Sequence, residues 1–164
     1  MSVQLQMSPL QLKELLYKKI LIEAAVDLTE AEGYWAPTFD FEGVKLVADL
    51  AVGFAKGQQD DPRQFMVEMT VAIPNDPEDG KRAPYTLDIQ AQAWIEVADG
   101  IPKDKRREIV EVNGASLILG AIRELVLQVT GRSGLGPMLL PTLRFLPQPA
   151  PGSDPSANLG KTHA

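Results

Sequence analysis

Three stretches of the chain alternate between apolar and polar residues, which is the period of a β-strand with one buried face. They cover residues 45–54, 64–73 and 85–97. In the last stretch, Leu87 and Ile89 alternate with Asp88 and Gln90. Antiparallel sheets tolerate one solvent-exposed face, so the pattern predicts an antiparallel sheet. An Asp-Gly pair at residues 79–80 is typical of a hairpin loop and predicts that the last two strands are neighbours.

Residues 106–130 follow the period of a helix instead. Apolar residues recur at helical spacing in one stripe, at Ile118, Ile122, Leu125 and Val129. Further apolar residues widen this stripe over most of the helix circumference, which indicates burial on more than one side. We therefore expect the stripe to pack in the core and also to contribute to contacts between subunits.

Local signals conflict over residues 10–22. Ser8 and Pro9 are typical of a helix N-terminus. The same stretch also fits a strand whose apolar face consists of Leu10, Leu12, Leu16, Ile20 and Ile22. On local pattern alone, the helix is the stronger interpretation.

Composition divides the chain into one domain and a tail. Its 164 residues, 45% of them hydrophobic, suit a single globular domain, which we expect over residues 1–146. Residues 147–164 are rich in Pro, Gly and Ser and have almost no apolar content, which predicts a disordered tail.

Charge and residue counts argue against several classes of function. The sequence has no cysteine, and its one histidine, His163, is too near the chain end for a Ser-His-Asp triad. A net charge of −6 argues against nucleic acid as a partner. The longest uncharged apolar run, residues 112–122, is too short for a membrane span, and the first residues lack a signal-peptide pattern. We expect a cytoplasmic protein with no metal and no cofactor.

The sequence from residue 115 to residue 145, ASLILGAIRELVLQVTGRSGLGPMLLPTLRF, resembles the C-terminal signature of SecB-type export chaperones. That signature has an Ala-Arg-Glu step in an apolar helix, a Ser-Arg-Gly turn, a proline-containing loop and a final Asn-Phe. The counterparts here are Ile122-Arg123-Glu124, Gly131-Arg132-Ser133, Gly136-Pro137 and Arg144-Phe145. Upstream, residues 10–24 are similar to the family's first strand, with matches at Tyr17, Lys18, Glu23 and Ala24.

The resemblance implies an α+β fold, in which a four-stranded antiparallel sheet is followed by a long C-terminal helix packed on one face. Residues 10–22 would then be an edge strand, because tertiary context can override local propensity. It also implies a homotetramer, a dimer of dimers with the helices sandwiched between sheets. The implied function is ATP-independent holding of unfolded polypeptides, which keeps precursors competent for export by the translocase motor ATPase SecA.

The candidates for a client-binding groove are four aromatic residues, Tyr34, Trp35, Phe39 and Trp94. Aromatic faces suit promiscuous apolar recognition, although core packing is the commoner role of such residues. Trp94 falls on the polar register of its strand. Tyr34 and Trp35 fall in the segment before the second strand.

The candidate docking face for the motor ATPase consists of Glu23, Asp49 and Asp88, although solvated strand residues explain these carboxylates equally well. Lys19 stands where the family pattern has Asp, and a reversed charge opposes such docking. The prolines after Leu146 also block the second helix that the family has there.

Two other interpretations stay open. The first is a SecB-like chaperone dedicated to one partner, such as an antitoxin, which the Lys19 exchange and the proline-rich tail favour. The second is a small α+β enzyme, for which the sequence offers no catalytic residue.

Overall fold

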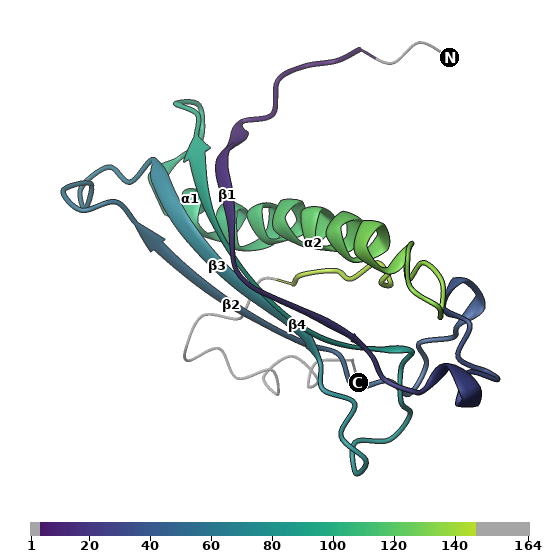
Figure 1. The fold of residues 1–164 in the computed structure, drawn as a ribbon. Coiled ribbons are helices and arrows are strands. Elements are labelled where there is room, and N and C mark those ends of the chain that lie inside the picture. The colour runs from purple at the N-terminus through teal and green to yellow at the C-terminus, as the bar shows by residue number, and fades with distance from the viewer. Residues whose placement is uncertain (1–3, 147–164) are drawn as a thin grey trace, which may run out of the picture.

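The structure, a computed structural model that describes residues 4–146, is a four-stranded sheet with a helix across one face (Figure 1). The strands are β1 (Leu10–Ala24), β2 (Val47–Phe54), β3 (Gln64–Ile73) and β4 (Tyr85–Val97). All pairs are antiparallel, and the order β1-β4-β3-β2 makes β1 and β2 the two edges. The predicted α+β fold is confirmed. The predicted tail, residues 147–164, lies outside the described residues.

The two central strands, β3 and β4, begin and end where the alternation predicts. They pair along the full length of β3, from Gln64 opposite Glu96 to Ile73 opposite Leu87. Every second side chain of both strands faces the helix, and all of these are buried. We call this the inner face of the sheet, and the opposite side the outer face. Both strands lie in the middle of the sheet, under the helix. Their alternation of apolar and polar residues is therefore regular along their whole length.

β1 is a strand, as the resemblance implies, so the helix favoured by local pattern is wrong. Its pairing with β4 shifts at two bulges, near Lys13 and Lys18, and each bulge moves the alternation by one residue. The inner-face residues are therefore Leu10, Leu12, Leu15, Tyr17, Ile20, Ile22 and Ala24. Spacings that alternate between two and three break the period of two by which a strand is recognised. Leu16, expected on this face, lies opposite Gln92 on the outer face.

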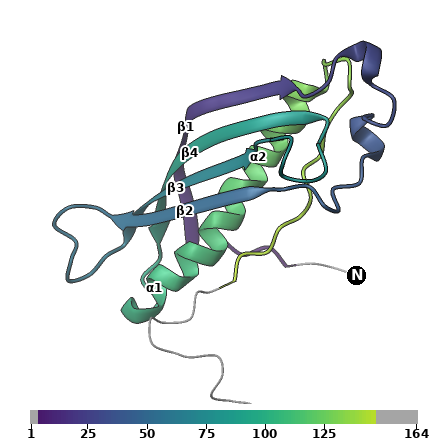
Figure 2. The same cartoon turned by 90° about the horizontal axis from the view of Figure 1, so that it is seen from below.

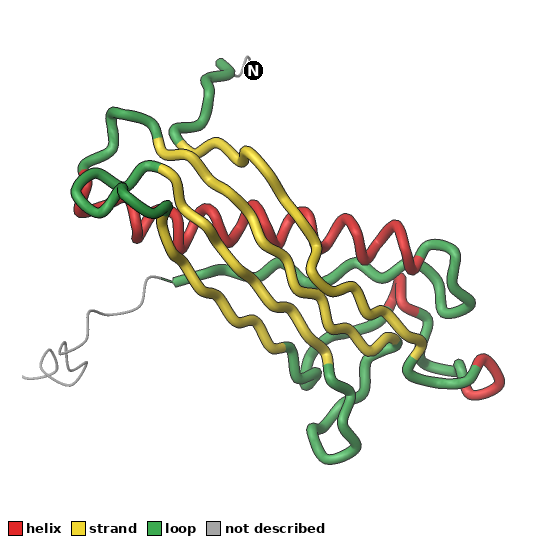
Figure 3. The backbone as a smooth tube through the Cα atoms, turned by 60° about the vertical axis from the view of Figure 1, so that its left-hand side comes forward, coloured by secondary structure: helices red, strands yellow, loops and turns green. Residues whose placement is uncertain are grey.

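One long helix crosses the inner face diagonally (Figures 2 and 3). It consists of α1 (Lys103–Ile109), a π-helical turn (Val110–Gly114) and α2 (Ala115–Thr130). It begins three residues before the predicted start because Pro102 occupies the N-cap position and its carbonyl accepts from the Lys105 N–H at 3.0 Å. Proline is well suited to a helix start, because the backbone N–H that it lacks would have no partner within the helix there.

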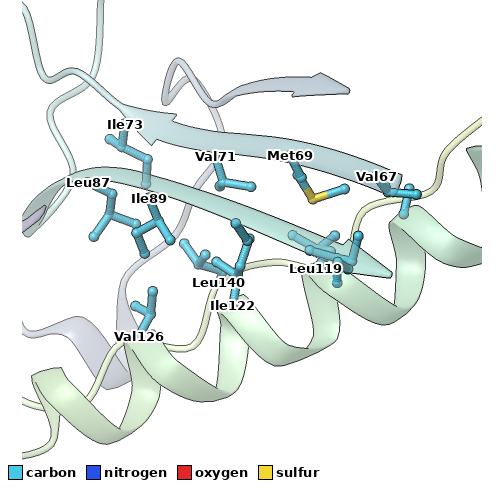
Figure 4. Close-up of a cluster of buried hydrophobic side chains, with 14 of the residues drawn as sticks. Val67, Met69, Val71, Ile73, Leu87, Ile89, Leu119, Ile122, Val126 and Leu140 are labelled. Atoms are coloured by element: carbon cyan, nitrogen blue, oxygen red, sulfur yellow. The ribbon is translucent and has the colours of Figure 1, made fainter. Parts of the chain in front are cut away.

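The core lies between the helix and the inner face (Figure 4). Ile118, Ile122 and Val126 of α2 are fully buried there. After α2 the chain turns and runs back beside the helix as an extended segment, residues 135–146 (Figure 3). Met138 and Leu140 of this segment are also fully buried, so two elements, not one, cover the sheet.

Gly114 brings the helix close to β4. A Cβ atom at this position would lie 2.7 Å from Cδ1 of Ile95, which is itself buried. Gly120, in contrast, faces open space, with no atom within 4 Å of the equivalent Cβ position.

This contrast gives a matched pair of variants. Gly120→Ala should raise the free energy of unfolding by about 1 kcal/mol, because alanine restricts the unfolded chain and favours the helix. Gly114→Ala should lose that gain to the collision with Ile95. Urea unfolding measures both, and equal gains would contradict the close helix–strand contact.

The buried cation Arg106 ties the start of the helix to the β2–β3 loop. Its side chain, 4% exposed, donates to Asp61 Oδ1 at 2.7 Å and to the carbonyls of Pro62 and Ile101. Hydrogen bonds from Arg63 and from Arg106 lower the pKa of Asp61 to about 2. The ion pair therefore contributes to stability only where Asp61 is ionised.

Asp61→Asn should lower Tm at pH 7, because Arg106 loses its charged partner. The folded pKa of Asp61 is depressed from 3.8, so its contribution is present above about pH 4 and is lost as pH falls toward 2. The Tm difference between variant and unaltered chain should shrink over that range in a calorimetric pH series. Asp60→Asn, at an exposed neighbour, is the control and should leave Tm unchanged.

Candidate functional site

Three of the predicted groove residues, Tyr34, Trp35 and Phe39, lie together in the crossover between β1 and β2. The rings of Tyr34 and Phe39 stack at 6.5 Å, and Phe41 meets Phe39 edge-on at 5.3 Å. The Lys81 ammonium lies 4.8 Å from the Phe39 ring centroid. Tyr34 and Phe39 are half-buried, so these contacts use most of their surface.

Lys81 also fixes the turn of the crossover at Asp40. Its ammonium donates to the Asp40 carbonyl at 2.6 Å. A hydrogen bond from the Glu42 N–H, and then the Lys81 charge, lower the pKa of the Asp40 carboxyl. Electrostatics here hold the crossover against the β3–β4 loop.

Trp35 is 53% exposed and rests on the loop that follows α2. A Cβ at Gly136, whose φ is +80°, would lie 2.8 Å from the indole ring, so only glycine fits there. Leu28, 63% exposed, rests on Gly134 in the same way. We call Leu28 and Trp35, with the two glycines beneath them, the crossover patch.

Trp94 lies far from this patch. Its neighbours along β4, Ala93 and Ile95, are buried on the inner face, so Trp94 is on the outer face, opposite Met66 of β3. Tyr85, at the other end of β4, donates to the Gly136 carbonyl at 2.7 Å. Trp94 is nine positions further along the strand, a distance of roughly 30 Å. The four aromatic candidates therefore do not line one groove.

Trp94 instead borders a shallow pocket of about 390 Å³. Its other lining residues are Lys13, Glu14, Gln64, Ile95 and Glu96. Charged side chains of both signs surround the indole, with Lys13 and Glu96 paired at 2.7 Å.

A larger groove runs along the outer edge of β2, and sequence reasoning missed it. It has a volume of about 560 Å³ and is lined by residues 48–52, Arg107, Glu111, Phe145 and Leu146. We call it the β2 groove. Arg107 donates to the Val52 carbonyl at 3.3 Å and pairs with Glu111 at 2.8 Å, which closes one end. Phe145 and the exposed Leu146 form an apolar wall opposite the strand.

The carboxylates of the predicted docking face all lie on the outer face. Glu23 and Asp49 are exposed, whereas Asp88 is half-buried and paired with Lys19. Two further lysines of β1 also form ion pairs with carboxylates of neighbouring strands. Lys13 pairs with Glu96 at 2.7 Å and Lys18 pairs with Glu68 at 2.6 Å. These cross-strand pairs reduce the acidic character of the face.

The predicted helix stripe divides between the core and the surface. Ile118 and Ile122 are fully buried within this chain. Leu125 is half-buried, and Val129 is 47% exposed, as is Leu117 at 44%. On the helix, Val129 and Leu117 are therefore exposed enough to contact another subunit.

No helix within residues 4–146 is long and apolar enough to cross a membrane. Nor do three or more His, Cys, Asp or Glu side chains converge there as metal ligands would.

No known family profile matches this chain, and no curated protein is similar to it in sequence. Several solved structures are similar to it, among them the following two. One is the SecB-like chaperone Rv1957 of Mycobacterium tuberculosis in complex with a ChAD peptide from the Rv1956 HigA1 antitoxin, at 19% identity and a TM-score of 0.45, over 82% of this chain and 90% of that one. The other is a protein of unknown function from Streptococcus agalactiae, at 14% identity and a TM-score of 0.51, over 83% and 97% of the two chains. The second likeness shows that this fold occurs in a known structure.

Proposed function

We propose that this chain is an ATP-independent holding chaperone, which binds unfolded polypeptides in the β2 groove and keeps precursors competent for export from the cytoplasm. The observation that carries the proposal is the β2 groove itself. It combines an open strand edge, since no strand within residues 4–146 pairs with the outer side of β2, with one apolar wall formed by Phe145 and Leu146. Asp49, Arg107 and Glu111 make much of the remaining lining polar.

The chemistry of the groove suits an extended chain of almost any sequence. An unfolded segment can bond to an open strand edge through its main chain, which is common to all sequences. Its apolar side chains gain roughly 25 cal/mol for each Å² that they bury. A holding function needs both features, and it needs no nucleotide because binding alone shifts the client's folding equilibrium.

The crossover patch supplies a second apolar surface. Leu28 and Trp35 are each more than half exposed, although both are large and apolar. A long unfolded client that contacts both surfaces gains from effective concentration, so each contact can be weak. The net charge of −6 keeps a loaded complex soluble.

We further propose that the chain forms a homo-oligomer, a tetramer built as a dimer of dimers. β1 is a long edge strand whose inner face keeps Leu12 at 39% and Ile20 at 50% exposure. Leu117 and Val129 on the helix are exposed to a similar degree. Pairing of two copies along β1 would cover the strand edge and these side chains together.

A chaperone dedicated to one partner is the second candidate function. A surface that recruits the motor ATPase SecA through carboxylates needs them unpaired, whereas Lys13, Lys18 and Lys19 each engage one. A pull-down separates the two candidates. A single stoichiometric partner such as an antitoxin supports the dedicated chaperone, and SecA with many precursors supports export.

Holding activity is tested by the aggregation of a denatured test protein, followed by light scattering without nucleotide. The unaltered chain should suppress aggregation, and Ala48→Asp should weaken suppression at least threefold, because it adds a further carboxylate to the strand wall of the β2 groove, where apolar client side chains would lie. Ala24→Asp, an equally exposed alanine on the other edge strand, is the control. Absence of suppression at molar excess contradicts the proposed function. Equal effects of both variants contradict the assignment of client binding to the β2 groove.

Assembly is tested by native mass spectrometry, with four times 17.9 kDa expected for the tetramer. Ile20→Lys should shift the mass toward the monomer, since it places a charge on the β1 edge. Phe54→Lys changes a residue of similar exposure, 41%, on the opposite edge and should leave the mass unchanged. The reverse outcome would assign assembly to β2 and contradict the proposal.

A further inference from the structure

The extended segment after α2 has the pattern of a bound peptide. Its side chains alternate between the core and solvent. Met138 and Leu140 are fully buried, and Leu143 and Phe145 are half-buried. The residues between them point outward, with Leu139 at 54% and Leu146 at 66% exposure.

The first half of this segment, residues 135–140, is held by specific hydrogen bonds. The Met138 N–H donates to the buried Thr130 hydroxyl at 2.8 Å. Arg123 donates to the Leu140 carbonyl at 2.9 Å, and the Leu135 carbonyl accepts from the Ala36 N–H at 2.9 Å. This half is fixed to both the helix and the crossover.

The second half, residues 141–146, is held differently, and we call it the strap. Within the described part of the chain, no hydrogen bond joins the strap to another element. Leu143 and Phe145 attach it through apolar contact alone. Such attachment is weak, because only partial burial stabilises it against the conformational freedom of a released chain end.

The strap ends at the β2 groove. Phe145 and Leu146 form one wall of the groove, and residues 48–52 of the strand form the other. An extended peptide that lies along β2 therefore meets Phe145. It gains the apolar surface beneath Leu143 and Phe145 only if the strap leaves.

We propose that the strap is an exchangeable internal ligand of the apolar surface beneath Leu143 and Phe145, next to the β2 groove, and is displaced by an extended peptide with apolar residues at every second position. The inference rests on the proposed holding function and adds to it both a ligand class and a built-in competitor. Because the strap is part of the chain, it lowers the apparent affinity for any peptide by the fraction of time that the site is free.

The test measures binding of a fluorescent peptide that carries the strap sequence PTLRFL to the full chain, by anisotropy. The double variant Leu143→Ser/Phe145→Ser, with a weakened strap, should bind this probe at least tenfold more tightly than the unaltered chain. That ratio corresponds to a strap that occupies its site about nine-tenths of the time. The control variant Leu139→Ser/Arg144→Ser changes outward-facing residues and should bind like the unaltered chain.

Unchanged affinity in the folded double variant, or an equal gain in the control, overturns the proposal. A probe with serine in place of its Leu and Phe should bind no variant tightly, and tight binding would indicate nonspecific adhesion instead. If the double variant does not fold by circular dichroism, methyl NMR of the unaltered chain decides. The Leu143 methyl signals should move to random-coil positions when the probe is added, and no change refutes displacement.

Failure of the strap and failure of the holding function give different results. Suppression of aggregation by the unaltered chain, together with unchanged probe affinity in the double variant, refutes only the proposal that the strap is displaced. Absence of suppression in the unaltered chain removes the holding function.

Discussion

One helix is too narrow to cover four strands, and the rest of this structure depends on that mismatch. A helix with its side chains is about 10–12 Å wide, whereas the outermost of four strands lie about 14 Å apart before their own side chains are counted. The diagonal helix covers the central strands fully and leaves the edges incomplete. On the β2 side the extended segment 135–146 covers part of the sheet that the helix does not reach. On the β1 side Leu12 and Ile20 stay exposed. Both surfaces to which we assign binding arise at these edges.

The central elements were predictable because their pattern is local. In β3 and β4 every second residue is buried by the same helix, so the period of two survives in the sequence. In β1 two bulges break that period, and only a resemblance spanning the whole chain gives the right element. The helix stripe was visible in the sequence, but how much of it is buried was not. Ile122 is buried and Val129 is exposed because the helix crosses the sheet at an angle that no local pattern encodes.

The functional surfaces were less predictable because they join distant parts of the chain. The β2 groove brings together residues 48–52, Arg107 and Phe145. Trp94 is aromatic and partly exposed, as expected, but strand alternation places it on the face opposite to the crossover patch. The glycines of the loop after α2 carried a usable signal, since Gly136 has a positive φ against the indole of Trp35. This signal could be read only with the knowledge that the crossover between β1 and β2 packs on this loop.

The bulges of β1 have a consequence for colloidal behaviour. A long apolar edge strand is ordinarily a template for uncontrolled sheet growth, and natural proteins blunt such edges with bulges and lysines. β1 carries both, at Lys13 and Lys18. An interrupted edge accepts a partner only in a register that matches its irregular spacing, as a second copy related by twofold symmetry does. The same strand can therefore favour a closed assembly and resist fibril formation, which matters for a protein that keeps apolar surface in contact with water.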